Sequence, residues 1–316
     1  MAAEHDKLKG EKPNQLADIV DDMEAVAKEN ARETPAEGKY VIEDTYKDRE
    51  IDLVAEGEED PSIYVRTSTL LPMEKLAADQ VRIIGVGGIG RQVGLQVAAS
   101  GVGSAVLYDD DEITKTNVST QGYPYLDVGE LKVKSLLYNM NEVTPCGIFM
   151  GYESKFPLEE DFDIDLADKQ GGPTFCCVDK IGERIKIFEA LHNCPLWVDG
   201  RMAAETGRVI TILFEDKDDR KYYESTLFKQ EEQEPQKCTE KATIYCGSYI
   251  AAIMLSQYMR WARGLINPDD PYRDMMFSLK TLELFPYKQP VEKKQVKNKK
   301  AKNRRKGGAV GRKSKK

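Results

Sequence analysis

A glycine-rich segment at residues 81–90, VRIIGVGGIG, carries the residues with the clearest chemistry in the chain. Gly85 permits a tight turn after a strand, Gly87 lets the backbone approach phosphate oxygens, and Gly90 lets the next helix pack close to that strand. Gly88 lies inside the same loop. The free N–H groups at the start of the helix would bind the phosphates. The alternative is a glycine turn that binds no ligand.

Acidic residues follow the next strand at the distance expected for ribose recognition. The segment SAVLYDDD (104–111) ends in three aspartates, and Asp109 comes nineteen residues after Gly90. A carboxylate at this distance can accept hydrogen bonds from both ribose hydroxyls. An acidic turn would explain Asp109 without a ligand. The strand, loop and helix around the glycines favour the ribose role, and Asp110 is assigned to solvent.

The segment after the aspartates separates a dehydrogenase from another class of nucleotide enzyme. Its polar residues fall in three groups: Asp109 and Asp111, then Asn117 and Gln121, then Asp127, Gly129 and Lys132. This ordered set resembles the ThiF/MoeB family, the adenylating domain shared with ubiquitin-activating enzymes. Members of that family carry Asp-x-Asp, Asn-x-x-Arg-Gln and Asp-x-Gly-x-x-Lys. The resemblance covers about residues 66–260, which is most of the expected folded unit.

The resemblance implies an ATP-dependent adenylyltransferase that activates the C-terminal carboxylate of a ubiquitin-like or sulfur-carrier protein and releases pyrophosphate. Because charge builds up on the phosphates, such a site needs cations, N–H donors and Mg²⁺ rather than a strong base. Lys132 is expected to supply a charge to the phosphates, and Asn117 to orient them. The alternatives are a solvated helix lysine and a turn-forming asparagine. ATP and Mg²⁺ are therefore the expected cofactors, and Asp111 joins the nucleotide-binding residues.

A further acid, Asp179, ends the apolar segment TFCCVD (174–179). The resemblance makes it the Mg²⁺ carboxylate, although the family's Asp-x-x-Asp-Asn pattern has Cys176 and Lys180 at its outer positions here. The alternative is a cap on the following helix. Arg184, one turn into that helix, matches a family position, but it could equally pair with a neighbouring glutamate on the surface.

Two arginines of the family have no clear counterpart. Thr120 stands where the family has an arginine after the asparagine, which removes one phosphate cation. Arg91, just inside the glycine loop, could replace it in space. The second family arginine lies upstream of the first strand and reaches the partner subunit's site. Arg66 is the best candidate for it, and a plain surface arginine is the alternative.

The cysteines suggest one nucleophile and no structural zinc site. Cys238 lies in a polar stretch before a long apolar helix, where ubiquitin-activating relatives place a thioester or sulfur-handling cysteine. The helix dipole and two nearby lysines would stabilise its thiolate. The alternative is an ordinary free cysteine. Cys246, further into the helix, is expected in the core. The chain has no CxxC pair, so we expect no structural zinc.

The charge distribution divides the chain into three parts. Residues 1–60 hold nineteen Asp/Glu against eight Lys/Arg, whereas residues 291–316 hold thirteen Lys/Arg and one Glu. The sequence therefore predicts an acidic, largely disordered arm at 1–60, an ATP-binding adenylation domain at 61–288, and a basic disordered tail at 289–316. The tail is either a solubilising counter-charge or a nonspecific contact for nucleic acid or an acidic partner.

Strands and helices alternate through the folded unit. Strands are expected at 81–86, 104–109, 174–179 and 196–199, and helices at 89–101, 129–141, 181–193 and 242–264. An antiparallel pair is expected at 208–216 and 220–226. This pattern predicts an α/β fold with a doubly wound, mostly parallel Rossmann-like sheet extended by antiparallel strands, with disordered termini.

Setting and assembly follow from composition and from the family. No stretch approaches the ~20 apolar residues of a membrane span, and the N-terminus lacks the apolar centre of a secretory signal. We therefore expect no membrane partner, and because the six cysteines form no secreted disulfide framework, we expect a reducing, cytoplasmic setting. Relatives work as dimers, and the segments 242–264 and 275–285 offer a homodimer surface, unless both are core. Two alternative functions stay open: a NAD-dependent oxidoreductase, and a nucleotide-binding scaffold of the same fold that has lost catalysis.

Overall fold

The computed structural model describes residues 61–144, 146–156, 171–191, 194–227, 242–267 and 269–287. All of these lie in one compact unit of the chain, residues 54–316. The predicted arm at 1–60, the predicted tail at 289–316, and Cys238 lie outside the described residues. Within the described part, no helix combines the length and the apolar character that a membrane span requires.

Eight strands form a single sheet in the order β3-β2-β1-β4-β5-β6-β7-β8. The strands are β1 (Gln80–Ile84), β2 (Ser104–Tyr108), β3 (Ile148–Tyr152), β4 (Thr174–Cys176), β5 (Trp197–Ala203), β6 (Thr206–Ile212), β7 (Asp274–Ser278) and β8 (Glu283–Pro286). The strands from β3 to β5 pair in parallel, and those from β5 to β8 pair antiparallel. The predicted fold class, a mostly parallel sheet with an antiparallel extension, is confirmed.

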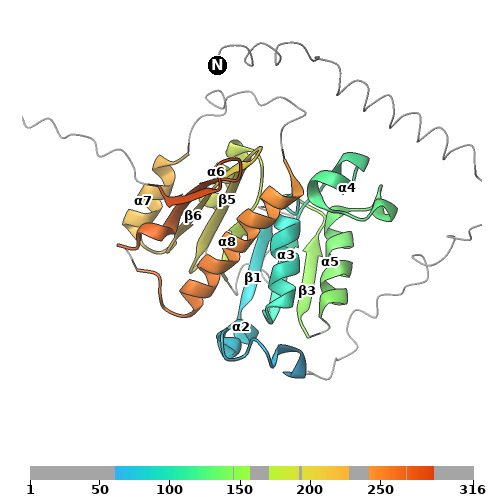
Figure 1. Cartoon of the computed structure of the whole chain (residues 1–316), viewed down its shortest axis with the longest axis horizontal. Helices are drawn as coiled ribbons and strands as arrows, with labels where there is room; N and C mark the ends of the chain where they lie inside the picture. Colours follow the sequence, from blue (N-terminus) through green and yellow to red (C-terminus); the bar gives the residue numbers. More distant parts are fainter. Residues whose placement is uncertain are drawn as a thin grey trace, which may run out of the picture. The chain divides into compact units, whose positions relative to one another are not determined.

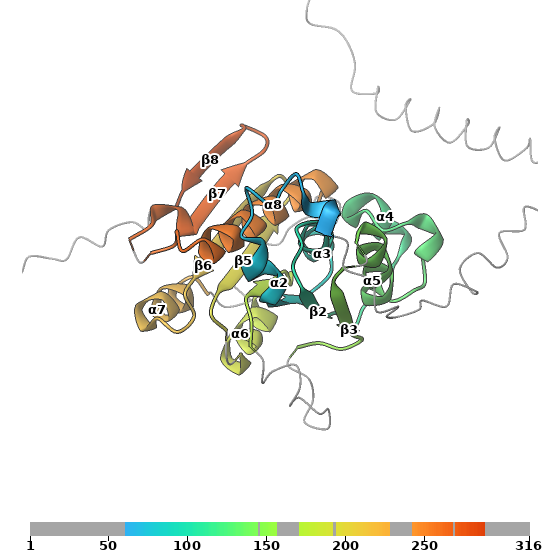
Figure 2. The ribbon, with the colours of Figure 1, turned by 90° about the horizontal axis from the view of Figure 1, so that it is seen from below.

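Helices cover both faces of the sheet (Figures 1 and 2). They are α2 (Met73–Ala78), α3 (Gly90–Ala99), α4 (Lys115–Gln121), α5 (Lys132–Val143), α6 (Ile181–Ala190), α7 (Lys217–Ser225) and α8 (Ile244–Ala262), with short 3-10 turns η1 (Pro61–Tyr64), η2 (Tyr125–Asp127) and η4 (Pro271–Arg273). One core cluster joins the sheet to α3, α5 and α8, and a second joins it to α6 and α7. Because both faces are covered, β1 and β2 are buried along most of their length, and β2 is mostly apolar, whereas β1 contains the buried Arg82.

The predicted strand at 220–226 is wrong, because this segment is the helix α7. Asp216 caps that helix by accepting hydrogen bonds from the N–H groups of Asp218 and Asp219, and acids in the first turn favour the positive end of the helix dipole. The buried ring of Tyr223 packs against Trp197 at 5.5 Å between centroids. The strand β6 pairs with β5 and β7 instead.

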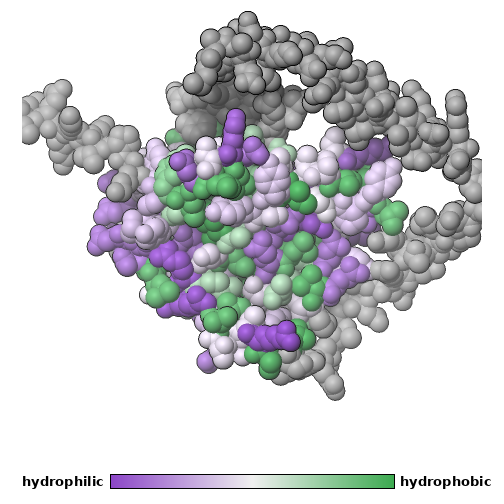
Figure 3. Space-filling view, viewed as in Figure 1, coloured by the Kyte–Doolittle hydropathy of each residue, from purple (hydrophilic) through white to green (hydrophobic). Residues whose placement is uncertain are grey.

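The sequence did not decide whether the segments 242–264 and 275–285 form a dimer surface or belong to the core. The structure gives a different answer for each. The helix α8 contributes eight buried residues and packs on the sheet, so most of it is core. Residues 274–286 form the hairpin of β7 and β8, and the side chains of Leu282, Leu284 and Phe285 are exposed there. Figure 3 shows apolar surface over this hairpin, at the upper left of the view. The dimer stays a prediction.

The carboxyl ends of the parallel strands gather the polar residues singled out in the sequence. Gly85 follows β1, Asp109 follows β2, and Asp179 comes three residues after the end of β4. Because parallel strands end at the same edge, these three positions share one side of the molecule, the edge at which ligands bind in open α/β sheets. The helix α4 lies at that edge, and α2 lies at the opposite one (Figure 1).

Candidate functional site

The glycine loop between β1 and α3 is fixed by its own backbone. Gly85 has φ of +84°, a left-handed conformation that favours glycine, and its N–H donates to the carbonyl of Tyr108 at 2.8 Å. A Cβ at Gly90 would lie 1.8 Å from the carbonyl oxygen of Gly85, so no side chain fits there. Packing and backbone geometry therefore account for the first and third glycines of the motif.

Gly87 has a different explanation. Its φ lies outside the left-handed region, and a Cβ there would meet no described atom closer than Gln121 Nε2, at 3.9 Å. Neither backbone conformation nor packing within the described part of the chain requires a glycine at this position. A glycine that faces open space beside free helix N–H groups leaves room for phosphate oxygens, so this loop fits a nucleotide.

Asp109 ties the glycine loop to the end of β2. Its Oδ2 accepts the N–H of Val86 at 2.8 Å, and its Oδ1 accepts the N–H of Asp111 at 2.9 Å. Burial raises the pKa of Asp109 above its ordinary value, and the nearby ammonium of Lys132 opposes that shift. The carboxylate therefore lies against the loop, at the position where the sequence predicts a ribose contact.

Lys132 meets both aspartates of the Asp-x-Asp motif. It is the first residue of α5, its N–H donates to the carbonyl of Asp111 at 3.0 Å, and it is only 6% exposed. Its Nζ donates to Asp111 Oδ2 at 2.5 Å and lies 3.9 Å from Asp109 Oδ1. The turn before α5 makes this approach possible, because Gly129 takes φ of +99° and donates to the carbonyl of Ile113. The fold thus brings together the aspartates and the lysine that the spacing singled out.

Tyr123 is a site residue that the sequence analysis missed. It is 1% exposed, and its hydroxyl donates to the carbonyl of Val86 in the glycine loop at 2.6 Å. The guanidinium carbon of Arg91 lies 5.1 Å from its ring centroid, and Arg91 also donates to Asn139 of α5 at 3.1 Å. Burial lowers the pKa of Arg91. The guanidinium is therefore held between Tyr123 and α5, and the predicted role of Arg91 at the phosphates stays a prediction.

The end of the helix α4 lies against the glycine loop, where Thr120 and Gln121 come close to Gly88. Asn117 accepts the N–H of Thr114 with its Oδ1 at 2.8 Å, as part of a capping box. Thr120, where the family has arginine, uses its hydroxyl to donate to the carbonyl of Thr116 at 2.7 Å. The Oε1 of Gln121 is buried and has no partner among the described residues, although its amide lies close to Gly87. An orphaned acceptor beside the loop fits a site that takes a ligand.

Asp179 presents an uncommitted carboxylate at the same edge. The residue is exposed, and no ion pair or hydrogen bond of its carboxylate to another described residue is present. The helix α6 begins without a side-chain cap, which removes support for the cap alternative. Carboxylate oxygens are the ligands that Mg²⁺ prefers, so Asp179 fits the metal role. The carboxylates of residues 109–111 also lie within 4.8 Å of one another, but the ammonium of Lys132 already occupies two of them.

Arg184 is buried, which excludes the surface pair considered from the sequence. It is 4% exposed and donates to Asp199 Oδ1 at 2.8 Å and to the carbonyl of Gly200 at 2.9 Å. Its Nη1 also reaches the carbonyl of Asp179 at 3.4 Å. Burial alone would raise the pKa of Asp199, but Arg184 and Arg201 reverse this and lower it. These contacts of Arg184 join β5 to the start of α6. The signal for them in the sequence was Asp199, the acid that ends the segment LWVD (196–199).

The helix α8 supports the glycine loop at one close contact. A Cβ on Gly247 would lie 2.4 Å from the carbonyl oxygen of Gly88. Only a residue without a side chain lets the helix approach this near. A glycine inside a long apolar helix was the available signal, because such a residue usually has a packing reason.

Of two further predicted residues, Arg66 is described and lies away from this loop, and Cys238 lies outside the described residues. Arg66 is exposed and follows η1, whose Tyr64 lies against Gly101 at the far end of α3. Its expected role at a partner subunit's site stays a prediction, as does the nucleophile role of Cys238. Cys246 is in the core as predicted, and burial raises the pKa of its thiol to about 11.

Comparison with protein families finds one match that covers most of the chain. The model described as "ThiF family" matches residues 60–302. Among curated proteins, tRNA threonylcarbamoyladenosine dehydratase 1 of Saccharomyces cerevisiae is 24% identical over 42% of this chain and 32% of its own length. The adenylyltransferase and sulfurtransferase uba4 of Aspergillus fumigatus is 32% identical over 29% of this chain and 20% of its own. The chain thus spans a third or less of the length of these two relatives.

Solved structures share the fold. The structure of PaaA covers 90% of this chain and 88% of its own, with a TM-score of 0.52 and 16% identity. The structure of MccB from E. coli covers 72% of this chain and 69% of its own, with a TM-score of 0.52 and 14% identity. These similarities establish the fold, and the chemistry must be argued from the residues.

Proposed function

Because the chain belongs to the ThiF family, we propose that it is an ATP-dependent adenylyltransferase of the type found in ubiquitin-activating enzymes. The observation that carries the proposal is the cluster at the carboxyl edge of the sheet. There Asp109 and Asp111 meet the buried ammonium of Lys132 beside a glycine loop that is open at Gly87. The relatives named as adenylyltransferases support the same activity.

The chain's own residues would bind and orient the nucleotide. The N–H groups that open α3 would hold phosphate oxygens, Lys132 would add a positive charge beside them, and Asp109 would accept the ribose hydroxyls. Asn117 would orient the phosphates with its amide nitrogen, since its oxygen serves the cap of α4. Asp179 would hold Mg²⁺, which when bound neutralises the charge that develops on the phosphates.

The substrate we propose is the C-terminal carboxylate of a ubiquitin-like or sulfur-carrier protein. Its oxygen would attack the α-phosphorus, giving an acyl-adenylate and pyrophosphate. The name of one relative, the sulfur carrier protein ThiS adenylyltransferase of E. coli, supports this class; it is 46% identical over 15% of this chain. The thiolate of Cys238 would then attack the acyl carbon of the adenylate, forming a thioester and releasing AMP, and Arg66 would complete the site of a partner subunit in a homodimer.

The test is exchange of labelled pyrophosphate into ATP in the presence of a carrier that ends in Gly-Gly. We expect exchange that depends on Mg²⁺ and on the carrier, and its loss in Asp179→Ala. The control is Asp110→Ala, which removes an exposed acid whose only ion-pair partner among the described residues is Lys155, at 3.6 Å. Normal exchange in Asp179→Ala would remove that residue from the mechanism. No exchange with any carboxylate substrate would favour the scaffold that has lost catalysis.

A second substrate class is a carboxylate attached to tRNA. Relatives named tRNA threonylcarbamoyladenosine dehydratase, from S. cerevisiae and Bacillus subtilis, and the basic sequence after residue 291 favour it. Exchange stimulated by tRNA and not by a protein carrier would select this class. The family match disfavours a NAD-dependent oxidoreductase, and an NADH titration beside ATP tests that alternative directly.

A further inference from the structure

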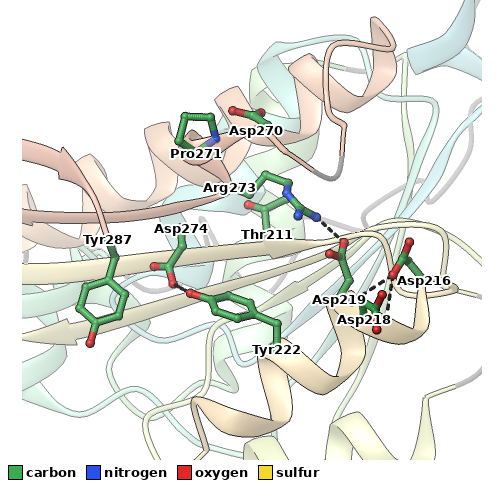
Figure 4. A pocket seen from close by; sticks show the side chains of 10 residues that line it. All are labelled: Thr211, Asp216, Asp218, Asp219, Tyr222, Asp270, Pro271, Arg273, Asp274 and Tyr287. Carbon is green, nitrogen blue, oxygen red and sulfur yellow. Dashed lines mark hydrogen bonds and ion pairs between the residues drawn. The ribbon is translucent and has the colours of Figure 1, made fainter. Parts of the chain in front are cut away.

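A pocket of about 410 Å³ lies at the antiparallel end of the sheet, and Figure 4 shows the side chains that line it. Its walls come from β6, the start of α7, η4 with β7, and the residue that follows β8. Figure 4 shows Tyr222 and Asp274 on one side of it and Asp219 with Arg273 on the other. The proposed nucleotide chemistry uses none of these residues, and we call this site the aspartate pocket.

The aspartate pocket carries an excess of negative charge. One guanidinium, that of Arg273, lines it together with five carboxylates: Asp216, Asp218, Asp219, Asp270 and Asp274. The inner three are paired with arginines: Asp219 with Arg273, Asp270 with Arg260, and Asp274 with Arg208. Within the described part of the chain, Asp216 and Asp218 form no ion pair. The rim of the pocket therefore offers two carboxylates to a cation from outside.

A second observation independent of charge points to a ligand. Thr211 lines the pocket and is 1% exposed, yet its Oγ1 has no hydrogen-bond partner among the described residues. Figure 4 shows it beside Arg273 at the centre of the labelled side chains. A buried hydroxyl without a partner costs free energy, so the great majority of such groups are paired in folded proteins. A polar ligand in the pocket would supply the missing partner.

The last described residue lies at this pocket, and the sequence that follows it is strongly cationic. Tyr287, the last described residue, lines the pocket, and its N–H donates to the carbonyl of Asp274 at 2.7 Å. Residues 288–316 follow directly and contain fourteen Lys/Arg against one Glu. A tethered segment this close has an effective concentration of the order of millimolar, so even a weak site would be occupied.

We propose that the aspartate pocket binds the basic C-terminal segment 288–316 of the same chain. Lysine and arginine side chains of that segment would pair with Asp216 and Asp218 at the rim, and a polar group of the segment would satisfy Thr211. The ring of Tyr287 already takes a cation, since the guanidinium of Arg208 lies 4.0 Å from its centroid, so the proposed pairing uses the carboxylates. A divalent cation fits less well, because the three inner carboxylates already have arginine partners.

Zero-length carbodiimide cross-linking of the full chain tests this proposal. A 1:1 mixture of unlabelled and ¹⁵N-labelled protein distinguishes links within a chain from links between chains. We expect lysines of 288–316 to link to Asp216 or Asp218 of their own chain, in preference to the exposed controls Glu74 and Asp110. The links should disappear at 1 M salt, where the screening length is about 3 Å.

Limited trypsin digestion of the full chain gives a second readout. The variant Asp216→Asn with Asp218→Asn keeps a cap acceptor for α7 but removes both rim charges. We expect cleavage within 288–316 to become about two- to tenfold faster in this variant. The matched variant Glu74→Gln with Asp110→Asn should leave the rate unchanged.

Three results would overturn the proposal. Links spread over all exposed acids in proportion to their exposure would mean that the pocket binds no segment. Links only between labelled and unlabelled chains would replace it with docking of a second copy. Equal cleavage rates in the wild-type protein and both double variants would show that the charges of Asp216 and Asp218 do not bind the segment 288–316.

Discussion

Adding a single methyl group to α8 tests whether that helix supports the glycine loop. In Gly247→Ala, the new Cβ would lie 2.4 Å from the carbonyl oxygen of Gly88 and 3.0 Å from its carbonyl carbon, so helix or loop must move. Both contacts are backbone atoms, which cannot rotate away as the end of a side chain can. We therefore expect the substitution to shift the loop that is proposed to hold the phosphates.

The expected magnitude follows from two opposing effects. Replacing glycine by alanine in a helix stabilises it by about 0.5–1 kcal/mol. Overpacking a close contact costs about 1–3 kcal/mol. Gly182→Ala in α6 isolates the first effect, because a Cβ there meets no described atom within 4 Å. The Gly247 variant should thus unfold with a free energy about 1–3 kcal/mol below that of the Gly182 variant.

The assay combines urea unfolding with ATP binding by titration calorimetry. Gly182→Ala should be at least as stable as the wild-type protein and bind ATP normally, whereas Gly247→Ala should be less stable and bind ATP more weakly. If the two variants had the same unfolding free energy and the same ATP affinity, the close approach of α8 to the loop would have no energetic role.

The remaining predictions concern the charged groups of the site. In Lys132→Met we expect exchange to fall by roughly 10²–10³-fold, the cost of losing one group that stabilises transition-state charge; unchanged exchange would exclude Lys132 from the phosphates. In Asp199→Ala the buried Arg184 loses its carboxylate, so the unfolding free energy should fall by about 3–5 kcal/mol. Lys186→Ala, which breaks a surface ion pair with Glu183, should change the unfolding free energy by less than about 0.5 kcal/mol. If both substitutions changed it equally, the ion pair of Arg184 with Asp199 would have no special role in stability. Burial raises the pKa of Asp109 above 3.8, so the unfolded chain ionises first as pH rises. As pH rises from below 3.8 through the pKa of Asp109 in the folded state, the unfolding free energy of the wild-type protein should therefore fall relative to that of Asp109→Asn. If urea titrations gave the same difference between the two proteins at every pH, this prediction would be refuted.

Local patterns in the sequence were sufficient to predict the loop and the strands β1, β2, β4, β5 and β6, whereas β3, β7 and β8 were not predicted. The apolar run before Gly85, the helical spacing after Gly90 and the acids at 109–111 each follow from one segment of chain. Their meeting at one edge follows from parallel topology. The family resemblance assigned Lys132 and Asp111 to one site, but it did not predict that the two side chains pair with each other.

Contacts between distant segments could not be predicted in this way. The hydroxyl of Tyr123 reaches Val86, and Arg184 reaches Asp199, through packing that no single segment reveals. The helix α7 was misassigned because Tyr222 and Tyr223 favour strands, whereas the cap from Asp216 and the burial of Tyr223 decide the outcome. Tertiary context overrode a local preference at this position.

A crystal structure of the full chain with Mg²⁺ and a non-hydrolysable ATP analogue would test the adenylation site most directly. We expect phosphate oxygens on the N–H groups after Gly87, the ammonium of Lys132 beside them, the ribose hydroxyls on Asp109, and the metal on Asp179. A nucleotide bound elsewhere, or a loop filled by the protein's own side chains with no density for the analogue, would contradict this expectation.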